Sequence, residues 1–295
     1  MKVNLTMTQN IQDPVYGPKF RELRKQANKN LTETATGITS KSSLDRWEKG
    51  NDNLSFSKVI DLLQRIGIQP NEFLESNVPS RLFFLYYKPM VAYKNNDLAQ
   101  LKELIIEYAN DLDQKENKRI SLFQYAISCN AYEDLTGKSV ISDFNQKRIC
   151  NYFRNLEHWT YENIFLFLSI QLLLSPTLLI KLSNSLISYS KNNRIDKQKW
   201  YPMLLESIIN AIFVLLKFQK ASDAKIILGK YQTLPMDDRY TFERIRVNFM
   251  SALIDYTSTK DNSHISSLLL SIQNLGLDHL YSDLKFAANQ IFNLY

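Results

Sequence analysis

Glycine and proline, the residues that most often end strands and form tight turns, are scarce in this chain. There are 7 glycines and 8 prolines in 295 residues, about 2–3% each, against averages of roughly 7% and 5%. Because few positions can supply the backbone conformations that hairpins need, most of the chain is expected to be helical. The fold class we predict is therefore all-α.

The glycines are also too far apart to form a phosphate-binding loop. The closest pair, Gly37 and Gly50, is separated by 13 positions. Neither GxGxxG nor GxxxxGK[ST] can therefore be written anywhere in the sequence. This excludes the two commonest classes of glycine-rich nucleotide-binding site.

Cysteine and histidine are equally rare, and their spacing fits no metal or catalytic motif. Cys129 and Cys150 cannot form a CxxC ligand pair or a disulfide framework, and His158, His264 and His279 share no HExxH spacing. No serine lies in a GxSxG motif. We expect no cofactor, no metal and no enzymatic activity. The cysteines are expected to pack as small hydrophobic residues, with a redox role as the alternative.

The chain has no apolar run long enough to cross a membrane. Its most apolar stretch, residues 164–180, contains Ser169, Gln171 and Pro176, whereas a spanning helix needs about 20 mostly apolar residues. Residues 1–18 contain no apolar segment of the length that a secretory signal needs. We predict that this stretch forms two buried helices that meet at Pro176. We also predict that the protein has no membrane partner and is cytoplasmic.

Positive charge is concentrated near the start of the chain. The net charge is +6, and residues 1–50 hold nine basic and five acidic residues, so four of the six surplus charges lie there. This distribution favours an N-terminal module that binds a polyanion, although an ordinary solvated surface also produces such a bias.

The first 76 residues have the pattern of five short helices. Apolar spacing and capping residues predict helices over about 16–27, 31–36, 41–48, 56–66 and 69–74. Gly37 stands at the turn between the second and third, which is the layout of a helix-turn-helix domain. We therefore place a DNA-binding domain at residues 1–76.

The residues of this segment are more specific than its order of helices. The key stretch is Ser40-Lys41-Ser42-x-Leu44-x-Arg46-Trp47-Glu48-Lys49-Gly50, preceded by Tyr16-Gly17, Arg21, Leu23 and Arg24-Lys25 and followed by Ile68-x-x-Asn71-Glu72-Phe73. It resembles the Rgg/GadR/MutR branch of the RRNPP superfamily, in which this stretch commonly reads close to SKSxLSxFExG. Trp47 replaces the usual phenylalanine. The resemblance implies a phage-repressor-like, XRE-type helix-turn-helix and a C-terminal TPR-like domain that binds short signalling peptides.

Residues 77–295 are expected to form a helical repeat array. Amphipathic segments predict eleven helices, at about 80–94, 97–112, 117–134, 142–156, 161–174, 176–191, 199–218, 221–234, 238–257, 263–275 and 278–294. In pairs they give units of roughly 35–40 residues, typical of TPR-like arrays, although the W-x2-L-G-x2-Y signature is missing. We predict a right-handed array whose concave face holds an extended peptide and whose helices also mediate dimerisation.

The third helix is predicted to read DNA. Leu44 and Trp47 define its buried side, so the opposite face can enter the major groove. The predicted base-reading residues are Lys41, Ser42, Ser43 and Arg46. The predicted phosphate contacts are Arg21, Arg24, Lys25, Thr32 and Ser40. Asp45 is expected to pair with Lys41 or Lys49. The alternative is that this face is merely solvated.

One such module contacts few base pairs, so a homodimer on double-stranded promoter DNA is expected. The end of the chain is unusually apolar, with Phe286, Ile291, Phe292, Leu294 and Tyr295. These residues either mediate self-association or pack back on the last repeat.

Polar residues within apolar helices are the predicted peptide contacts, because amide side chains can bond to an extended backbone. They are Ser169, Gln171, Asn210 and Asn248, with Arg244 and Arg246 for a peptide carboxylate. Each could instead make a structural hydrogen bond between helices. The segment Glu157-His158-Trp159-Thr160-Tyr161 resembles the start of a helix that runs into the ligand pocket of related regulators, and Leu172 stands where some of them carry a basic residue, which suggests a more apolar peptide.

The function predicted from the sequence is a bacterial transcriptional regulator, controlled by a short, hydrophobic, imported signalling peptide in quorum sensing. The alternative is a constitutive helical-repeat scaffold with a non-regulatory N-terminal domain.

Overall fold

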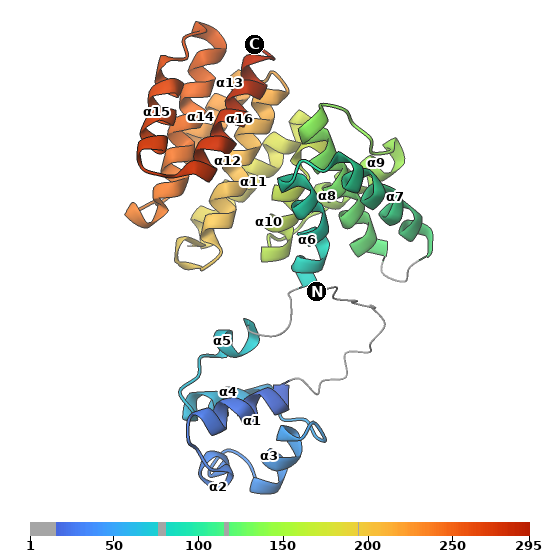
Figure 1. The fold of residues 1–295 in the computed structure, drawn as a ribbon, viewed down its shortest axis with the longest axis vertical. Coiled ribbons are helices and arrows are strands. Elements are labelled where there is room, and N and C mark those ends of the chain that lie inside the picture. Colours follow the sequence, from blue (N-terminus) through green and yellow to red (C-terminus); the bar gives the residue numbers. More distant parts are fainter. Residues whose placement is uncertain (1–15, 76–80, 115–117, 194) are drawn as a thin grey trace. The chain divides into compact units, whose positions relative to one another are not determined.

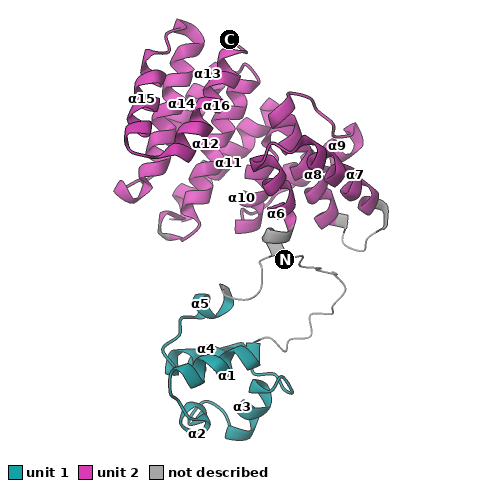
Figure 2. Cartoon of the chain, viewed as in Figure 1, with its two compact units in different colours: residues 1–81 teal, residues 82–295 magenta. Residues whose placement is uncertain are grey.

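The computed structural model describes residues 16–75, 81–114, 118–193 and 195–295. Within these ranges the chain is helical, with no β-strand, which confirms the predicted all-α class. It forms two compact units, residues 1–81 and 82–295 (Figure 2). The predicted domain boundary at residue 76 lies outside the described residues.

The first unit contains the five expected helices: α1 (Tyr16–Gln26), α2 (Leu31–Ala35), α3 (Lys41–Glu48), α4 (Phe56–Arg65) and α5 (Pro70–Glu75). Side-chain caps set the beginnings of α2 and α3. Asn30 accepts a hydrogen bond from the Glu33 backbone N–H at 2.8 Å, and Ser40 accepts one from Ser43 at 3.0 Å. Gly37 has a φ of +78°, so it provides the left-handed residue that ends α2 and turns the chain toward α3.

A small apolar core holds these helices together. Its buried members are Phe20, Ala35, Leu44, Trp47, Leu62, Leu63, Ile66 and Phe73. They come from all five helices and the end of α4, so α5, although only six residues long, closes the core through Phe73. Burial of each large side chain contributes roughly 1.5–3 kcal/mol.

The second unit contains eleven described α-helices, as the sequence predicted. They are α6 (Arg81–Lys94), α7 (Leu98–Gln114), α8 (Lys118–Thr136), α9 (Asp143–Arg154), α10 (Tyr161–Ser169), α11 (Pro176–Asn193), α12 (Tyr201–Lys217), α13 (Ala221–Tyr231), α14 (Thr241–Thr259), α15 (Ser263–Asn274) and α16 (Asp278–Phe292). Three short 3₁₀ helices lie between them: η1 (Gln171–Leu173), η2 (Ile195–Lys197) and η3 (Asp238–Tyr240).

Most of these helices pack in two layers that run side by side along the array (Figure 1). Helices α8, α10, α12, α14 and α16 contact each other in succession, and α9, α11 and α13 do the same beside them. Helix α12 contacts both layers, and twelve of its 17 residues are buried. It is therefore the central helix of the unit.

Pro176 divides the most apolar segment as expected. Helix α10 ends at Ser169, η1 follows, and α11 begins at Pro176, where a first-turn proline costs no hydrogen bond. None of the helices in the described part of the chain is long and apolar enough to span a membrane.

Candidate nucleic-acid interface and ligand face

Helix α3 has one buried side and one exposed side. Leu44 and Trp47 are buried in the core of the first unit, as predicted, whereas Lys41, Ser42 and Arg46 are exposed. The Ser40 hydroxyl caps the helix, which fixes where its first turn begins. Helix α3 thus presents a short polar surface of defined position.

A glycine allows α1 to cross closely over α3. A Cβ atom on Gly17 would lie 1.8 Å from the Trp47 carbonyl oxygen, far inside van der Waals contact. Next to this crossing, the Phe20 and Trp47 rings pack with centroids 5.2 Å apart. The Tyr16-Gly17 pair therefore serves packing, because only glycine permits this approach.

Arg24 is a structural residue, and its predicted phosphate contact is corrected. Its guanidinium donates from Nε and Nη2 to the two carboxylate oxygens of Glu48, both at 2.6 Å, and from Nη1 to the Lys29 carbonyl at 2.7 Å. The side chains of Arg24 and Glu48 are only 8% and 2% exposed. Such a buried bidentate pair joins α1 to α3 and leaves no exposed guanidinium for DNA. The sequence contained no local signal for it, since the partners are 24 residues apart.

The remaining predicted phosphate contacts lie at the surface. Arg21, Lys25 and Thr32 are exposed. Ser40 is exposed as well, but its hydroxyl is bonded to the backbone and side chain of Ser43. An open hollow of about 560 Å³, lined by Leu31, Lys41, Ser42 and Asp45, lies beside the start of α3. These residues remain predictions for DNA contact.

Two surface ion pairs organise the exposed side of α3. Asp45 pairs with Lys49 at 2.6 Å, one of the two partners expected from the sequence. Arg46 Nη2 pairs with Asp52 Oδ2 at 2.8 Å, although the Arg46 side chain remains 63% exposed. Exposed pairs of this kind are weak, so Arg46 can exchange Asp52 for another acceptor at little cost.

Arg65, which the sequence analysis missed, supports the turn before α3. It lies at the end of α4 and donates to the backbone carbonyls of Thr36 and Thr34 near the end of α2. It therefore satisfies carbonyl groups that a helix end leaves without partners. Only the tertiary structure reveals this role, because about 30 residues separate the donor from its acceptors.

In the second unit, one stripe of α12 is polar. Glu206, Asn210 and Lys217 are spaced by four and seven residues, so they lie on the same side of the helix. All three are only partly buried, whereas most of α12 is apolar and inaccessible. We call these three residues the α12 polar stripe. Every member contacts a residue of another helical segment.

Near the middle of the stripe, Asn210 belongs to a hydrogen-bond network with η1. Its Nδ2 donates to Gln171 Oε1 at 3.0 Å, and Gln171 Nε2 donates to the Ser207 carbonyl at 2.8 Å. Gln171 is buried, so its predicted peptide contact is corrected: this side chain makes the structural hydrogen bond that was the alternative. Ser169 is partly exposed and donates to the Phe165 carbonyl within its own helix. Ser169 and Asn210 remain accessible candidates.

At the amino-terminal end of the stripe, Glu206 meets α14. Arg246 Nη1 donates to Glu206 Oε1 at 3.0 Å, and the guanidinium carbon lies 4.8 Å from the centre of the Phe242 ring. Of the other two predicted residues on α14, Arg244 is exposed and donates to the Met236 carbonyl at 2.6 Å, while Asn248 is exposed. The structure thus places Arg246, but not Arg244, in contact with the stripe.

At the other end, Lys217 takes part in a four-helix cluster around Asp134 of α8. Lys217 Nζ lies 2.7 Å from Asp134 Oδ1, and the Tyr93 hydroxyl of α6 donates to Oδ2 at 2.5 Å. Gln290 of α16 donates to the Asp134 carbonyl at 2.9 Å. We call this the Asp134 cluster. Burial raises the pKa of the neighbouring Glu133, whose Oε2 atom is buried without a hydrogen-bond partner.

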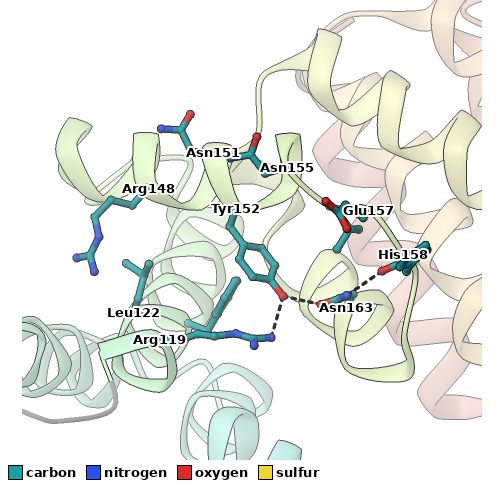
Figure 3. Close-up of a pocket in the computed structure, with 11 residues that line it drawn as sticks. Arg119, Leu122, Arg148, Asn151, Tyr152, Asn155, Glu157, His158 and Asn163 are labelled. Atoms are coloured by element: carbon teal, nitrogen blue, oxygen red, sulfur yellow. Dashed lines mark hydrogen bonds between the residues drawn. The ribbon is translucent and has the colours of Figure 1, made fainter.

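A separate open hollow of about 800 Å³ lies on α8, α9 and the start of α10 (Figure 3). Arg119 donates to the Tyr152 hydroxyl at 2.8 Å, and Tyr152 donates to Asn163 Oδ1 at 2.5 Å. Asn163 in turn donates to the His158 carbonyl at 3.1 Å. This chain of bonds fixes the Glu157–Tyr161 segment that sequence resemblance associated with a ligand pocket, while Trp159 within it is buried.

The sequence profile of the HTH-type transcriptional regulator Rgg, C-terminal domain, matches residues 102–285, more than half of the chain. The chain belongs to the Rgg family. A helix-turn-helix profile also matches residues 20–73, which contain α3 and its capped turn. Family membership confirms the resemblance inferred from Ser40–Gly50. It also assigns the Rgg protein to a class of transcriptional regulators rather than to a class of enzymes. No curated protein matches the chain in sequence.

Solved structures share the fold of this Rgg protein over almost its whole length. The Streptococcus dysgalactiae SHP pheromone receptor Rgg2 is 18% identical, with a TM-score of 0.72, and the match covers 93% of this chain and 99% of that one. A regulator from Listeria monocytogenes EGD-e has a TM-score of 0.74 at 19% identity, covering 94% and 97%. The PrgX/cCF10 complex has a TM-score of 0.65 at 13% identity, covering 94% and 92%.

The apolar end of this Rgg protein serves partly as core. Ile291 is buried, and the ring of Phe292 packs on Tyr256 with centroids 4.5 Å apart. Phe286 and Leu294 stay exposed. Tyr295 also packs against the core of the second unit. Packing on the last repeat therefore accounts for Ile291, Phe292 and Tyr295, and of the five residues Phe286 and Leu294 remain available for self-association.

No group of three or more histidine, cysteine, aspartate or glutamate side chains in the described residues is arranged to hold a metal ion. Cys129 and Cys150 are both buried and free, and burial raises the pKa of the Cys129 thiol to about 12.

Proposed function

We propose that this Rgg-family protein is a cytoplasmic transcriptional regulator that reads double-stranded promoter DNA with α3. The observation that carries the proposal is the two-sided geometry of α3: Leu44 and Trp47 anchor it, and Lys41, Ser42 and Arg46 are exposed on its other side. A helix of this width fits the major groove, and an arginine can donate to guanine O6 and N7 together. Ser43, partly exposed, completes the base-reading set.

The phosphate contacts in this proposal are Arg21, Lys25 and Thr32, with the backbone at Ser40. They supply affinity and set the register without reading sequence. The first 76 residues are the DNA-binding domain. Because one module covers few base pairs, the operator is read by a homodimer, and the exposed Phe286 and Leu294 of the repeat domain contribute to self-association.

The repeat domain, residues 77–295, is proposed to bind a short, hydrophobic, imported signalling peptide. Support comes from the partly exposed polar stripe on the mostly apolar central helix. Further support comes from two structurally similar proteins, one a pheromone receptor and the other crystallised as a PrgX/cCF10 complex. Ser169, Asn210, Arg246 and the more peripheral Arg244 and Asn248 are the candidate contacts. The peptide would act in quorum sensing by favouring one of two arrangements of the array.

The test is a gel shift of the purified full chain on the DNA upstream of its own gene, at two salt concentrations, followed by footprinting. A regulator gives a protected operator that survives excess random DNA, and log affinity falls with log salt in proportion to the phosphates neutralised. A constitutive scaffold gives no protected site. Absence of protection, with and without peptides encoded beside the gene, would contradict the proposal.

A further inference from the structure

The last helix of the array bonds back to a helix near its start. Gln290 of α16 donates from Nε2 to the Asp134 carbonyl of α8 at 2.9 Å, and 156 positions separate the two residues in the sequence. The main packing partners of α16 are α12, α14 and α15, so this bond reaches beyond them. It joins the final helix of the second unit to the part of the array that contains α6, α7 and α8.

The acceptor of this bond is a carbonyl group at the end of a helix. Helix α8 ends at Thr136, and the last four carbonyl groups of an α-helix have no partner within the helix. Of these four, the Glu133 carbonyl accepts from the Gly137 N–H at 2.8 Å, whereas the Asp134 carbonyl accepts from Gln290. Gln290 is therefore a cap that another helix supplies, and it holds the last turn of α8 in place.

The side chain of the same residue, Asp134, holds α6 and α12. The Tyr93 hydroxyl, in the last turn of α6, donates to Oδ2 at 2.5 Å, and Lys217 Nζ of α12 lies 2.7 Å from Oδ1. The Asp134 side chain is only 19% exposed, so water replaces a lost donor poorly, and hydrogen bonds to an ionised carboxylate are stronger than those between neutral groups. The end of α6 therefore depends on where the last turn of α8 places Asp134.

We propose that Gln290 and Asp134 form a latch through which α16 controls the stability of α6. Withdrawal of Gln290 frays the last turn of α8 and moves the Asp134 carboxylate away from Tyr93, so the end of α6 opens as well. Helix α6 is the helix of the repeat domain that follows the DNA-binding domain in the sequence. The regulatory meaning of the latch rests on the proposed function: a partner that binds or displaces α16 alters the helix that leads to the DNA-binding domain.

Hydrogen exchange of the purified full chain, measured by mass spectrometry of its peptides, tests the latch. Q290M removes the amide donor but keeps a side chain of similar length that favours helices. Although Gln290 bonds to α8, we expect exchange at the end of α6 to rise about fivefold, the factor for one hydrogen bond of ordinary strength. Y93F should in return raise exchange around Gln290, because coupling between two sites is reciprocal.

The double variant distinguishes a latch from two separate effects. Once Y93F has removed the hydroxyl, fraying of α8 no longer reaches α6 through Asp134. In the Y93F background, Q290M should therefore change the exchange of α6 by less than about twofold. Q273M is the matched control, because Gln273 is an exposed glutamine near the end of α15. This variant should exchange like the parent in α6, α8 and α16.

Three results would overturn the latch. The first is a rise in exchange in Q290M that is confined to α16 and the last turn of α8. The second is an equal rise in α11 and α13, because it would indicate a general loss of stability. The third is an undiminished effect of Q290M on α6 in the Y93F background. Each result concerns coupling within the repeat domain, so it is separate from the gel shift and footprint that test the proposed function.

Discussion

Arg24 and Glu48 form a buried bidentate ion pair that joins α1 to α3, the helix proposed to read DNA, with both N–O distances at 2.6 Å. Glu48 belongs to the same sequence motif as Arg46, yet the two residues face opposite ways: Glu48 is buried and Arg46 is exposed. The motif thus combines a residue that holds the helix with a residue that can contact DNA.

Breaking this pair should destabilise the first unit without changing the number of phosphate contacts. R24Q leaves Glu48 buried without its cation, which typically costs about 3–5 kcal/mol. Hydrogen exchange of α1 and α3 peptides in the full chain should show this loss of protection. The salt dependence of DNA binding by the folded fraction should be unchanged.

R21Q is the matched control for that experiment. Arg21 lies on the same helix but is exposed, so we expect parental protection and a log–log salt slope reduced by about 0.9. A smaller salt slope for R24Q, with normal hydrogen exchange, would instead indicate that Arg24 contacts a DNA phosphate.

Arg46 should determine sequence preference. R46A is expected to weaken binding to the operator by about 1–3 kcal/mol, with much less effect on random DNA, because only a base contact discriminates. D52N removes the negative charge that pairs with Arg46 at 2.8 Å and should leave operator preference intact or increase it. Gel shifts on both DNAs measure these effects, and equal losses on both for R46A would exclude a base-reading role.

Gly17 should tolerate no side chain. In G17A the new Cβ would lie 1.8 Å from the Trp47 carbonyl, so α1 and α3 must separate at a cost of about 1–3 kcal/mol. Urea unfolding of the full chain, followed by circular dichroism, gives the comparison. G229A is the control, because a Cβ there meets no atom within 4 Å and alanine in a helix is favoured by roughly 0.5–1 kcal/mol. Equal stability of the two variants would show that the crossing relaxes freely.

Glu133 should make the repeat domain less stable as pH rises. Burial raises its pKa in the folded chain, and the nearby Asp134 carboxylate adds to this, whereas Lys217 opposes it. As pH increases from acid, the unfolded chain therefore releases this proton first, and stability falls until the folded chain has released it too. The melting temperature of E133Q minus that of the parent should therefore be larger at about pH 7.5 than at about pH 4. E157Q is the control, because Glu157 is exposed, and its difference in melting temperature from the parent should be the same at both pH values. A pH-independent difference for E133Q would contradict the prediction.

Neither cysteine should regulate DNA binding. The thiolate is the reactive form, and burial raises the pKa of Cys129 to about 12 and also raises that of Cys150. Iodoacetamide should leave both unmodified in the native chain and alkylate both after unfolding. Operator affinity should be the same before and after mild peroxide treatment; a change that a reductant reverses would indicate a redox role.

Local patterns were sufficient for most of the architecture. The eleven helices of the second unit and the five of the first follow from apolar spacing, with caps such as Ser40 and left-handed glycines such as Gly37 at their ends. The buried side of α3 was also predictable, because Leu44 and Trp47 are three residues apart on one helix. These features depend on neighbours within one or two turns.

Long-range contacts explain why the structure gives some residues other roles than the sequence predicts. The sequence predicts Arg24 as an exposed charge, whereas in the structure it pairs with Glu48. The sequence predicts Gln171 as a ligand contact, whereas in the structure it is bonded to Asn210 and to the Ser207 carbonyl. Nothing in the local sequence distinguishes a paired polar side chain from a free one. Arg244 and Arg246 differ for the same reason, since only Arg246 reaches α12.

The sequence by itself determined that this protein is helical, roughly where its helices lie, and which family it belongs to, because propensity, capping and apolar periodicity act over a few residues. Only the tertiary structure decided which arginines hold the fold and which remain available, and that Glu206, Asn210 and Lys217 of α12 stay partly exposed. The physical reason is that burial and ion pairing are set by whichever segment packs opposite a side chain, and those segments lie tens of residues away.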